Sequence, residues 1–237
     1  MAIENKKVFY KGVLYFISFF VVLVLIFSPI FGDGKNGLVY SDDMFNKLSK
    51  GSSYFIPKIM KGNEKNMGKQ FSVTVTLDKP EDAQKAAEQF KKAGNEAQQD
   101  AGTLKVSGDL GKTLDAILKD SDDMFKNNAD KLKADYGYDG KEVLTYWWQA
   151  LVKMDKALKK DGKIQEAKDV GAVMKKAVEP AYNFYGIESQ KVSDKVGIMT
   201  GLLIFYVVYT MWWGFAIYYL FEGMGFSMKK AKVKKEV

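Results

Sequence analysis

The chain has 237 residues, a net charge of +7, no cysteine and no histidine, and all 36 of its basic residues are lysine. Cysteine and histidine are the usual ligands of haem, iron–sulfur clusters and zinc, and arginine provides the bidentate fork that recognises phosphate and carboxylate groups. The composition therefore argues against redox, zinc and nucleotide chemistry. We expect no metal, no haem, no other cofactor and no catalytic residue.

Two long uncharged hydrophobic runs stand near the ends of the sequence. They cover residues 12–32 and 196–221 and enclose a polar segment, residues 33–195. Each run exceeds the roughly 18 apolar residues at which a membrane-spanning helix becomes the default interpretation. The first run is longer than the core of a cleaved signal peptide and offers no small-x-small cleavage site, so we interpret it as an anchor. The sequence predicts a two-span membrane protein.

Lysine gathers in the two short tails, residues 1–11 and 222–237. The positive-inside rule places such tails in the cytoplasm, so residues 33–195 are expected on the outer, periplasmic side of an inner (cytoplasmic) membrane. An alternative role for the second tail is a site for anionic lipid, nucleic acid or an acidic partner. We favour a topology and lipid anchor, with no nucleic acid, formed by Lys6, Lys7, Lys229, Lys230, Lys232, Lys234 and Lys235.

The outer segment is predicted to be an α+β domain, mainly helical, and its residues 71–134 form a strand-helix-strand-helix unit. Apolar and polar residues alternate strictly over 71–77, as in a half-buried strand, and alanines at helical spacing follow over 83–93. A second strand at 103–106 leads into a further helix. Since two strands alone make a poor sheet, we expect either an additional strand or pairing with a partner.

Two short motifs in this segment have both a structural and a functional interpretation. The pentapeptide Ser-Asp-Asp-Met-Phe occurs at residues 41–45 and 121–125. We interpret both copies as helix starts capped by serine, because the acids lack the spacing of a calcium loop. Residues 108–113 resemble a phosphate-binding loop, but two residues separate their glycines where four are needed. An ordinary helix start is the better interpretation.

Residues 140–186 are predicted to form an antiparallel helical hairpin. Its first helix carries large apolar residues at alternating steps of three and four, namely Leu144, Trp147, Leu151, Met154 and Leu158. The pattern breaks at 160–163 and then resumes with smaller residues. Pro180 is expected to kink or end the second helix.

Two aromatic residues beside this stripe are candidates for contacts of the outer segment. Tyr146 and Trp148 flank the stripe residue Trp147 and point to another face. One interpretation buries both tryptophans in the core, as large aromatic residues usually are. The other makes one of them an anchor for a partner, since tryptophan is favoured at interface hot spots.

Aromatic residues near the middle distinguish the second hydrophobic run from the first. Tyrosine and tryptophan usually lie at headgroup level, and in lipid they need hydrogen-bond partners, so this face is expected to contact protein. Alternatively, the span ends near Gly214 and residues 215–228 form an amphipathic surface segment. The candidate packing residues, including a glycine pair at the spacing of close helix approach, are Gly197, Gly201, Tyr206, Tyr209 and Trp213.

The sequence pairs no residues into a persuasive catalytic site, so we expect a protein that is not an enzyme. Its tails are too short for an output, kinase or ATPase domain. We predict an accessory or structural subunit of a larger membrane complex, with other membrane protein subunits as partners in a hetero-complex, or copies of itself in a homo-oligomer. The alternatives are an export scaffold that resembles polysaccharide co-polymerases in topology only, and an extracytoplasmic ligand-sensing module without its own output domain.

Overall fold

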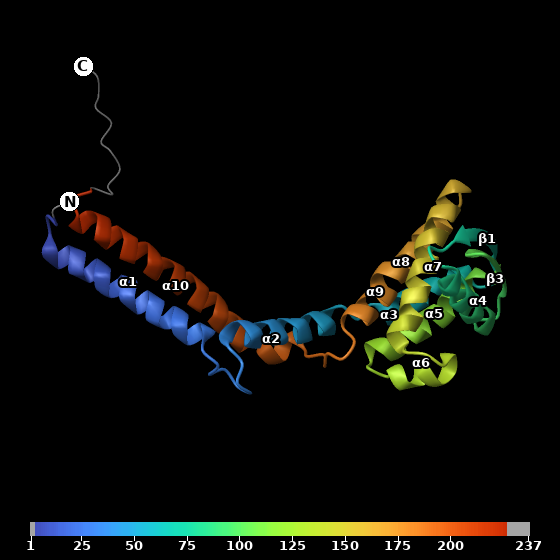
Figure 1. The fold of residues 1–237 in the computed structure, drawn as a ribbon, viewed down its shortest axis with the longest axis horizontal. Helices are drawn as coiled ribbons and strands as arrows, with labels where there is room; N and C mark the ends of the chain where they lie inside the picture. Colours follow the sequence, from blue (N-terminus) through green and yellow to red (C-terminus); the bar gives the residue numbers. More distant parts are fainter. Residues whose placement is uncertain (1–2, 227–237) are drawn as a thin grey trace, which may run out of the picture. The chain divides into compact units, whose positions relative to one another are not determined.

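The computed structural model describes residues 3–226. They form two compact units, one made of the chain up to residue 45 together with the chain from residue 191, and the other of residues 46–190. The described chain is mostly helical, with a small three-stranded antiparallel sheet and two apolar helices that could cross a membrane (Figure 1).

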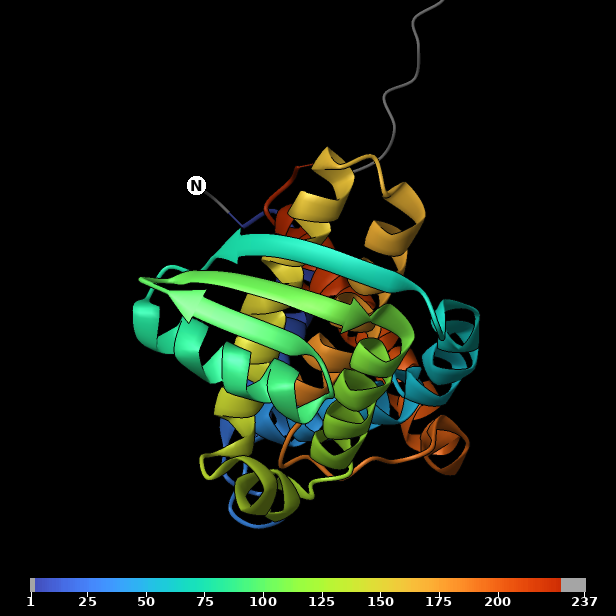
Figure 2. The same cartoon turned by 90° about the vertical axis from the view of Figure 1, so that its right-hand side faces the viewer.

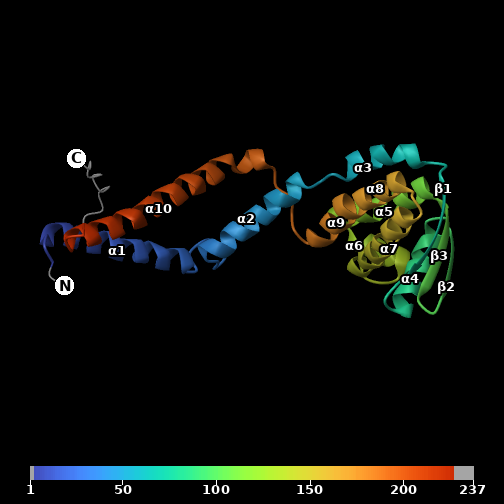
Figure 3. The ribbon, with the colours of Figure 1, turned by 90° about the horizontal axis from the view of Figure 1, so that it is seen from above.

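Two long apolar helices make up most of the first unit. α1 (Lys6–Phe27) and α10 (Val196–Gly223), which follows the 3-10 turn η3 (Val192–Lys195), lie side by side and run antiparallel (Figure 3). Their backbones come close at glycine, because a Cβ atom on Gly12 would lie 2.6 Å from the main-chain nitrogen of Leu220. Length and composition allow both helices to cross a membrane.

The second hydrophobic run continues as one helix to Gly223, and its contacts show which part of it lies beside the middle of α1. α10 has no break before Gly223, so residues 215–223 belong to the same helix and lie against the first turns of α1. Phe19, in the middle of the uncharged part of α1, stacks on Tyr209 with 4.1 Å between ring centroids. Tyr209 is therefore level with the middle of α1. Residues 227–228 of the alternative surface segment lie outside the described residues.

The second unit contains the sheet, and it has one strand more than the predicted strand-helix-strand-helix unit. Its strands pair in the order β1-β3-β2, all antiparallel, and their bounds are β1 (Gln70–Thr76), β2 (Glu96–Asp100) and β3 (Thr103–Asp109). β2 gives no alternating pattern because Ala97 is its only apolar and buried residue. Ala101 and Gly102, both with positive φ, form the tight turn into β3. The additional strand comes from within the chain.

Helices cover one face of this sheet (Figure 2). The alternation of β1 buries Phe71, Val73 and Val75 on that face, while Ser72 and Thr74 are exposed on the other. The remaining elements in chain order are α2 (Gly37–Ser52), which joins the two units, α3 (Ile56–Asn63), η1 (Glu64–Asn66), α4 (Pro80–Lys92), α5 (Leu110–Phe125), α6 (Ala129–Tyr136), α7 (Gly140–Lys160), α8 (Ile164–Val173), η2 (Met174–Val178) and α9 (Glu179–Asn183).

The second arm of the helical hairpin is not one regular helix. α8 passes into η2, a π-helical turn, and then into the short α9. Pro180 in the first turn of α9 has no main-chain N–H to donate, and the wider turn lies directly before it. α7 packs on α8, and Leu144, Trp147 and Leu151 of the predicted stripe are completely buried.

Neither copy of the repeated pentapeptide starts a helix. α2 is capped by Asn36, whose side-chain oxygen accepts from the Val39 amide at 2.9 Å, so Ser41 lies inside the helix. Ser121 also lies inside a helix, α5, and its hydroxyl donates to the Ile117 carbonyl at 2.7 Å. The prediction of two serine caps is wrong. Residues upstream fix both helix starts, and the Ser121 hydroxyl bonds back to the preceding turn of α5.

Candidate functional site

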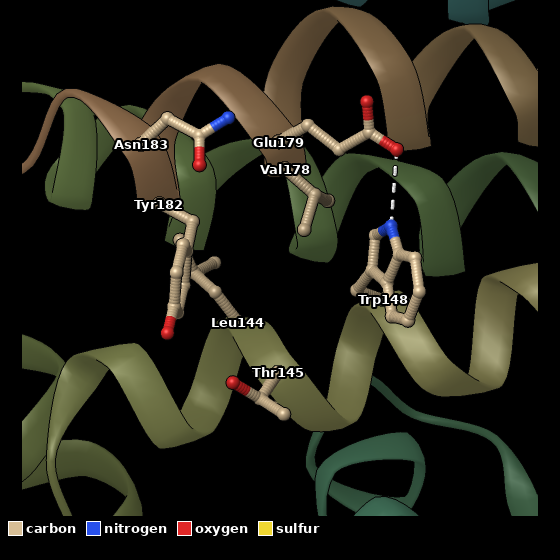
Figure 4. A pocket seen from close by; sticks show the side chains of 7 residues that line it. All are labelled: Leu144, Thr145, Trp148, Val178, Glu179, Tyr182 and Asn183. Carbon is tan, nitrogen blue, oxygen red and sulfur yellow. Dashed lines mark hydrogen bonds between the residues drawn. The ribbon is translucent and has the colours of Figure 1, made fainter.

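An open pocket lies between α7 and the η2–α9 segment and has a volume of about 370 Å³. Its size falls in the range of ligand pockets, about 300–1,000 Å³. Figure 4 shows the side chains that line it, which are Leu144, Thr145, Trp148, Val178, Glu179, Tyr182 and Asn183. Leu144 and Val178 are buried and form an apolar floor.

Helical spacing on two elements brings these side chains together. α7 contributes Leu144 and Trp148, which are four residues apart and so share a face. The other wall contributes Val178 from the end of η2, and Tyr182 one turn further on α9. The π-helical turn adds a residue to its turn of helix and so sets which α9 side chains face α7.

A carboxylate and an exposed indole form one end of the pocket. The Trp148 Nε1–H donates to Glu179 Oε1 at 3.0 Å, and Trp148 remains 42% exposed. Within residues 3–226, no ion pair joins a lysine to Glu179. Asp122 and Asp155, in contrast, each pair with the lysine four residues further along the chain.

A positive charge lies beside Tyr182, which lines the other end of the pocket. Tyr182 is 40% exposed, and the Lys141 ammonium lies 5.3 Å from its ring centroid. The same ammonium lies 5.7 Å from the ring of Tyr185, so it makes cation–π contacts to both rings. The pocket is therefore polarised, with a carboxylate beside Trp148 and an ammonium beside Tyr182.

The two interface candidates from the sequence occupy different places. Trp148 lines the pocket, whereas Tyr146 is half-buried and packs edge-on against Tyr138, with 5.7 Å between centroids. Trp147, between them, is completely buried and packs edge-to-face on Phe90 at 5.0 Å. Sequence reasoning missed Glu179, because a carboxylate on α9 gives no sign of which α7 side chain it will meet.

A partly buried carboxyl group, Asp120, joins three helices of the same unit. Asp120 on α5 accepts hydrogen bonds from the Tyr136 hydroxyl of α6 at 2.7 Å and from the Trp147 indole of α7 at 2.8 Å. Burial raises the pKa of Asp120 to about 6, and the two hydrogen bonds oppose this shift only in part. Burial and the nearby carboxylate also raise the pKa of Tyr136. No sequence spacing connects these three residues.

A buried lysine ties the end of α2 to the segment that follows α9. Lys50 is 2% exposed, and its ammonium donates to the Ile187 carbonyl at 2.5 Å and to Asn127 Oδ1 at 2.9 Å. The main-chain N–H of Gln190 donates to the Lys47 carbonyl at 3.0 Å. Burial lowers the pKa of Lys50. These bonds join the two segments of the second unit, around Lys47 and around Gln190, from which the chain continues into the first unit.

The segment that resembles a phosphate-binding loop is filled by the protein itself. Asp109 caps α5 and accepts from the main-chain N–H groups of Lys112 and Gly68 at 3.1 and 2.9 Å. The two glycines serve close packing, because a Cβ on Gly108 would lie 2.2 Å from the Asn95 side chain and one on Gly111 would meet main chain at 2.4 Å. This helix start offers no free anion site.

In the first unit, α1 supplies partners to several of the mid-run aromatic residues. The Tyr209 hydroxyl donates to the Phe19 carbonyl at 3.0 Å, and the Trp212 indole donates to the Tyr15 carbonyl at 3.2 Å. Trp213 packs against the Phe19 ring at 4.8 Å. The protein contact of these residues is therefore intramolecular, and contact with other chains stays a prediction for this face.

Three other candidate packing residues of α10 make no such contact. Tyr206 is 68% exposed, and within residues 3–226 its hydroxyl has no hydrogen-bond partner. A Cβ atom on Gly197 or Gly201 would have no neighbour within 4 Å among the described atoms.

Of the predicted lysine anchors, Lys6 and Lys7 are exposed in the first turn of α1. The remaining predicted anchors lie outside the described residues, namely Lys229, Lys230, Lys232, Lys234 and Lys235.

No protein-family model matches this chain, and neither the curated proteins nor the solved structures contain a match. Among residues 3–226, no group of three or more acidic side chains is placed to hold a metal ion.

Proposed function

We propose that this protein is a non-catalytic accessory or structural subunit of a larger membrane complex. In this proposal α1 and α10 cross the inner membrane, both termini are cytoplasmic, and residues 46–190 form the extracytoplasmic domain. Its contacts with other subunits run through α10 and through the outer domain. The observation that carries the proposal is the exposed Tyr206 on α10.

Tyr206 lies close to the middle of the apolar helix pair. It is one turn from Tyr209, which stacks on Phe19 in the middle of the uncharged part of α1. Inside a bilayer at this level, a phenol hydroxyl finds neither water nor an acceptor in lipid, and burying it unpaired is unfavourable. The Tyr209 hydroxyl has an acceptor within the chain, the Phe19 carbonyl. A helix of another subunit would supply an acceptor to Tyr206, a bond worth roughly 0.6–2 kcal/mol in membranes.

Cross-linking from this position tests the proposal. A benzophenone amino acid replaces Tyr206 in the full chain, which is expressed in its native host and irradiated in the membrane. The expected result is a covalent adduct with a different membrane protein, identified by mass spectrometry. The matched control places the same group at Leu14 of α1, which is equally exposed at 67% but carries no polar group in need of a partner.

Two results would contradict the proposal. An adduct made only of two copies of this chain would favour the homo-oligomeric scaffold. The absence of any protein adduct at position 206, together with a lone monomer after purification in mild detergent, would exclude a stable complex through α10.

A further inference from the structure

We propose that the pocket between α7 and α9 binds a basic side chain, arginine above lysine, presented by an extracytoplasmic segment of a partner subunit. This rests on the proposed function, because it assigns the chemistry of a contact made by the outer domain. The binding group is Glu179, with the Trp148 ring beside it and the floor of Leu144 and Val178 below.

Charge decides which kind of group the pocket accepts. Glu179 Oε1 takes one hydrogen bond from Trp148 and retains further acceptor capacity, and Oε2 has none assigned among the described residues. The chain has 36 lysines, yet none of those described forms an ion pair with this carboxylate. A cation arriving from outside therefore finds a carboxylate that is not already paired with a lysine among residues 3–226.

Shape and polarity select an amphipathic cation over a compact one. A long apolar stem fits over Leu144 and Val178, and its charged head then reaches the carboxylate, as basic side chains do when they lie on apolar surface. The Lys141 ammonium beside Tyr182 disfavours a second positive charge at that end. The pocket thus fixes the direction in which the side chain lies, with its head toward Trp148 and Glu179 (Figure 4).

Arginine matches this arrangement better than lysine does. Its planar guanidinium stacks on an indole face and donates several hydrogen bonds in one plane to a carboxylate. Trp148 is held in place by its bond to Glu179, so the ring and the acceptor are fixed together before binding. The chain itself contains no arginine, so an arginine in the pocket must come from another chain.

The test measures binding of a single side chain to the full chain in detergent. All four tryptophans are replaced by 5-fluorotryptophan, and the Trp148 signal is identified in the ¹⁹F NMR spectrum by Trp148→Phe. N-acetylarginine amide is expected to move this signal saturably and to leave the other three unchanged. N-acetylcitrulline amide, which has the same shape without the charge, is expected to bind at least about tenfold more weakly.

Two variants separate a carboxylate effect from a general charge effect. Glu179→Gln is expected to weaken binding of the arginine probe about tenfold or more, while an unchanged melting temperature confirms that the fold is intact. Glu166→Gln makes the same charge change on α8, outside the pocket lining, and should leave binding unaltered.

Several results would overturn the inference. Equal binding of the citrulline and arginine probes would make the site an apolar groove. Tighter binding of tetramethylammonium than of the arginine probe would make it a site for small organic cations. The absence of a saturable shift would remove the site altogether. None of these results touches the cross-link from Tyr206, so the inference and the proposed function fail independently.

Discussion

Protonation of Asp120 links the stability of the second unit to pH. Burial raises its pKa from an ordinary value of 3.8 to about 6, so the folded state binds this proton more tightly than the unfolded state does. The contribution to stability is therefore present below about pH 4 and is lost as the pH rises through 6. A shift of this size corresponds to a loss of up to about 3 kcal/mol.

The substitution Asp120→Asn is expected to remove this part of the pH dependence. The amide has nearly the same shape and can still accept a hydrogen bond from Trp147 or Tyr136, but it has no charge to be buried. Guanidinium unfolding between pH 4 and 7, followed by near-UV circular dichroism, measures the effect. Relative to the wild type, the variant should gain stability as the pH rises.

The control for this experiment is Asp100→Asn, at the exposed end of β2. It removes one carboxylate from the surface and should leave the difference between pH 4 and pH 7 unchanged. If Asp120→Asn and the wild type lost the same stability over this interval, Asp120 would not be the group that titrates.

At the same scale, the candidate pocket shows what sequence can reveal about a site. Trp148 was identifiable as an interface candidate because it stands beside a regular apolar stripe and outside its spacing. Glu179 was not, since its role depends on the π-helical turn that orients α9 toward α7. A contact between two elements depends on how they pack, so the sequence of either element alone does not reveal it.

At the scale of elements, periodicity predicted the longer elements with a regular buried face and missed the edge strand β2 and the short helices α3 and α6. β1 and α7 follow their alternating and three-four patterns, and both are buried accordingly. β2 is an edge strand with one buried residue, so no pattern marked it. The pentapeptide caps failed for a related reason: a capping residue type is informative only where no better start lies upstream.

The packing of α1 on α10 is expected to depend on Gly12 rather than on the predicted glycine pair. Gly12→Ile would place its Cβ 2.6 Å from the Leu220 main chain, which cannot move aside without separating the helices. Overpacking of this kind costs about 1–3 kcal/mol. Thermal unfolding of the full chain in detergent, followed by circular dichroism, should show a lower melting temperature.

Gly197→Ile is the matched control, because the same substitution meets open space on α10. Its melting temperature should stay close to that of the wild type. Equal destabilisation by both substitutions would mean that glycine acts here through helix propensity or lipid contact, and that the register of the two helices is different. In the native membrane, Gly197→Ile could also abolish the cross-link from position 206 to a partner while Gly12→Ile leaves it intact. That result would show that Gly197 contacts another subunit.

At the scale of the whole molecule, the proposal requires the chain to place its two units in different surroundings. The first unit consists largely of apolar helices with large side chains exposed along their length, including Leu14, Val24 and Leu203. The second unit has a continuous apolar core and a polar outer sheet face. Exposed apolar surface on helices of this length is typical of contact with lipid, whereas the second unit has the pattern of a domain in water.

Labelling of single cysteines is expected to locate the two units, because the natural chain has no cysteine. Thr74→Cys lies on the exposed sheet face, and Lys6→Cys lies at the start of α1. In intact spheroplasts, a membrane-impermeant maleimide should label position 74 and leave position 6 unlabelled, since lysine-flanked ends stay in the cytoplasm. Both positions should react after lysis, which controls for accessibility. Labelling of position 6 alone before lysis would mean that the chain is threaded in the opposite direction. Labelling of both before lysis would place positions 6 and 74 on the same side of the membrane.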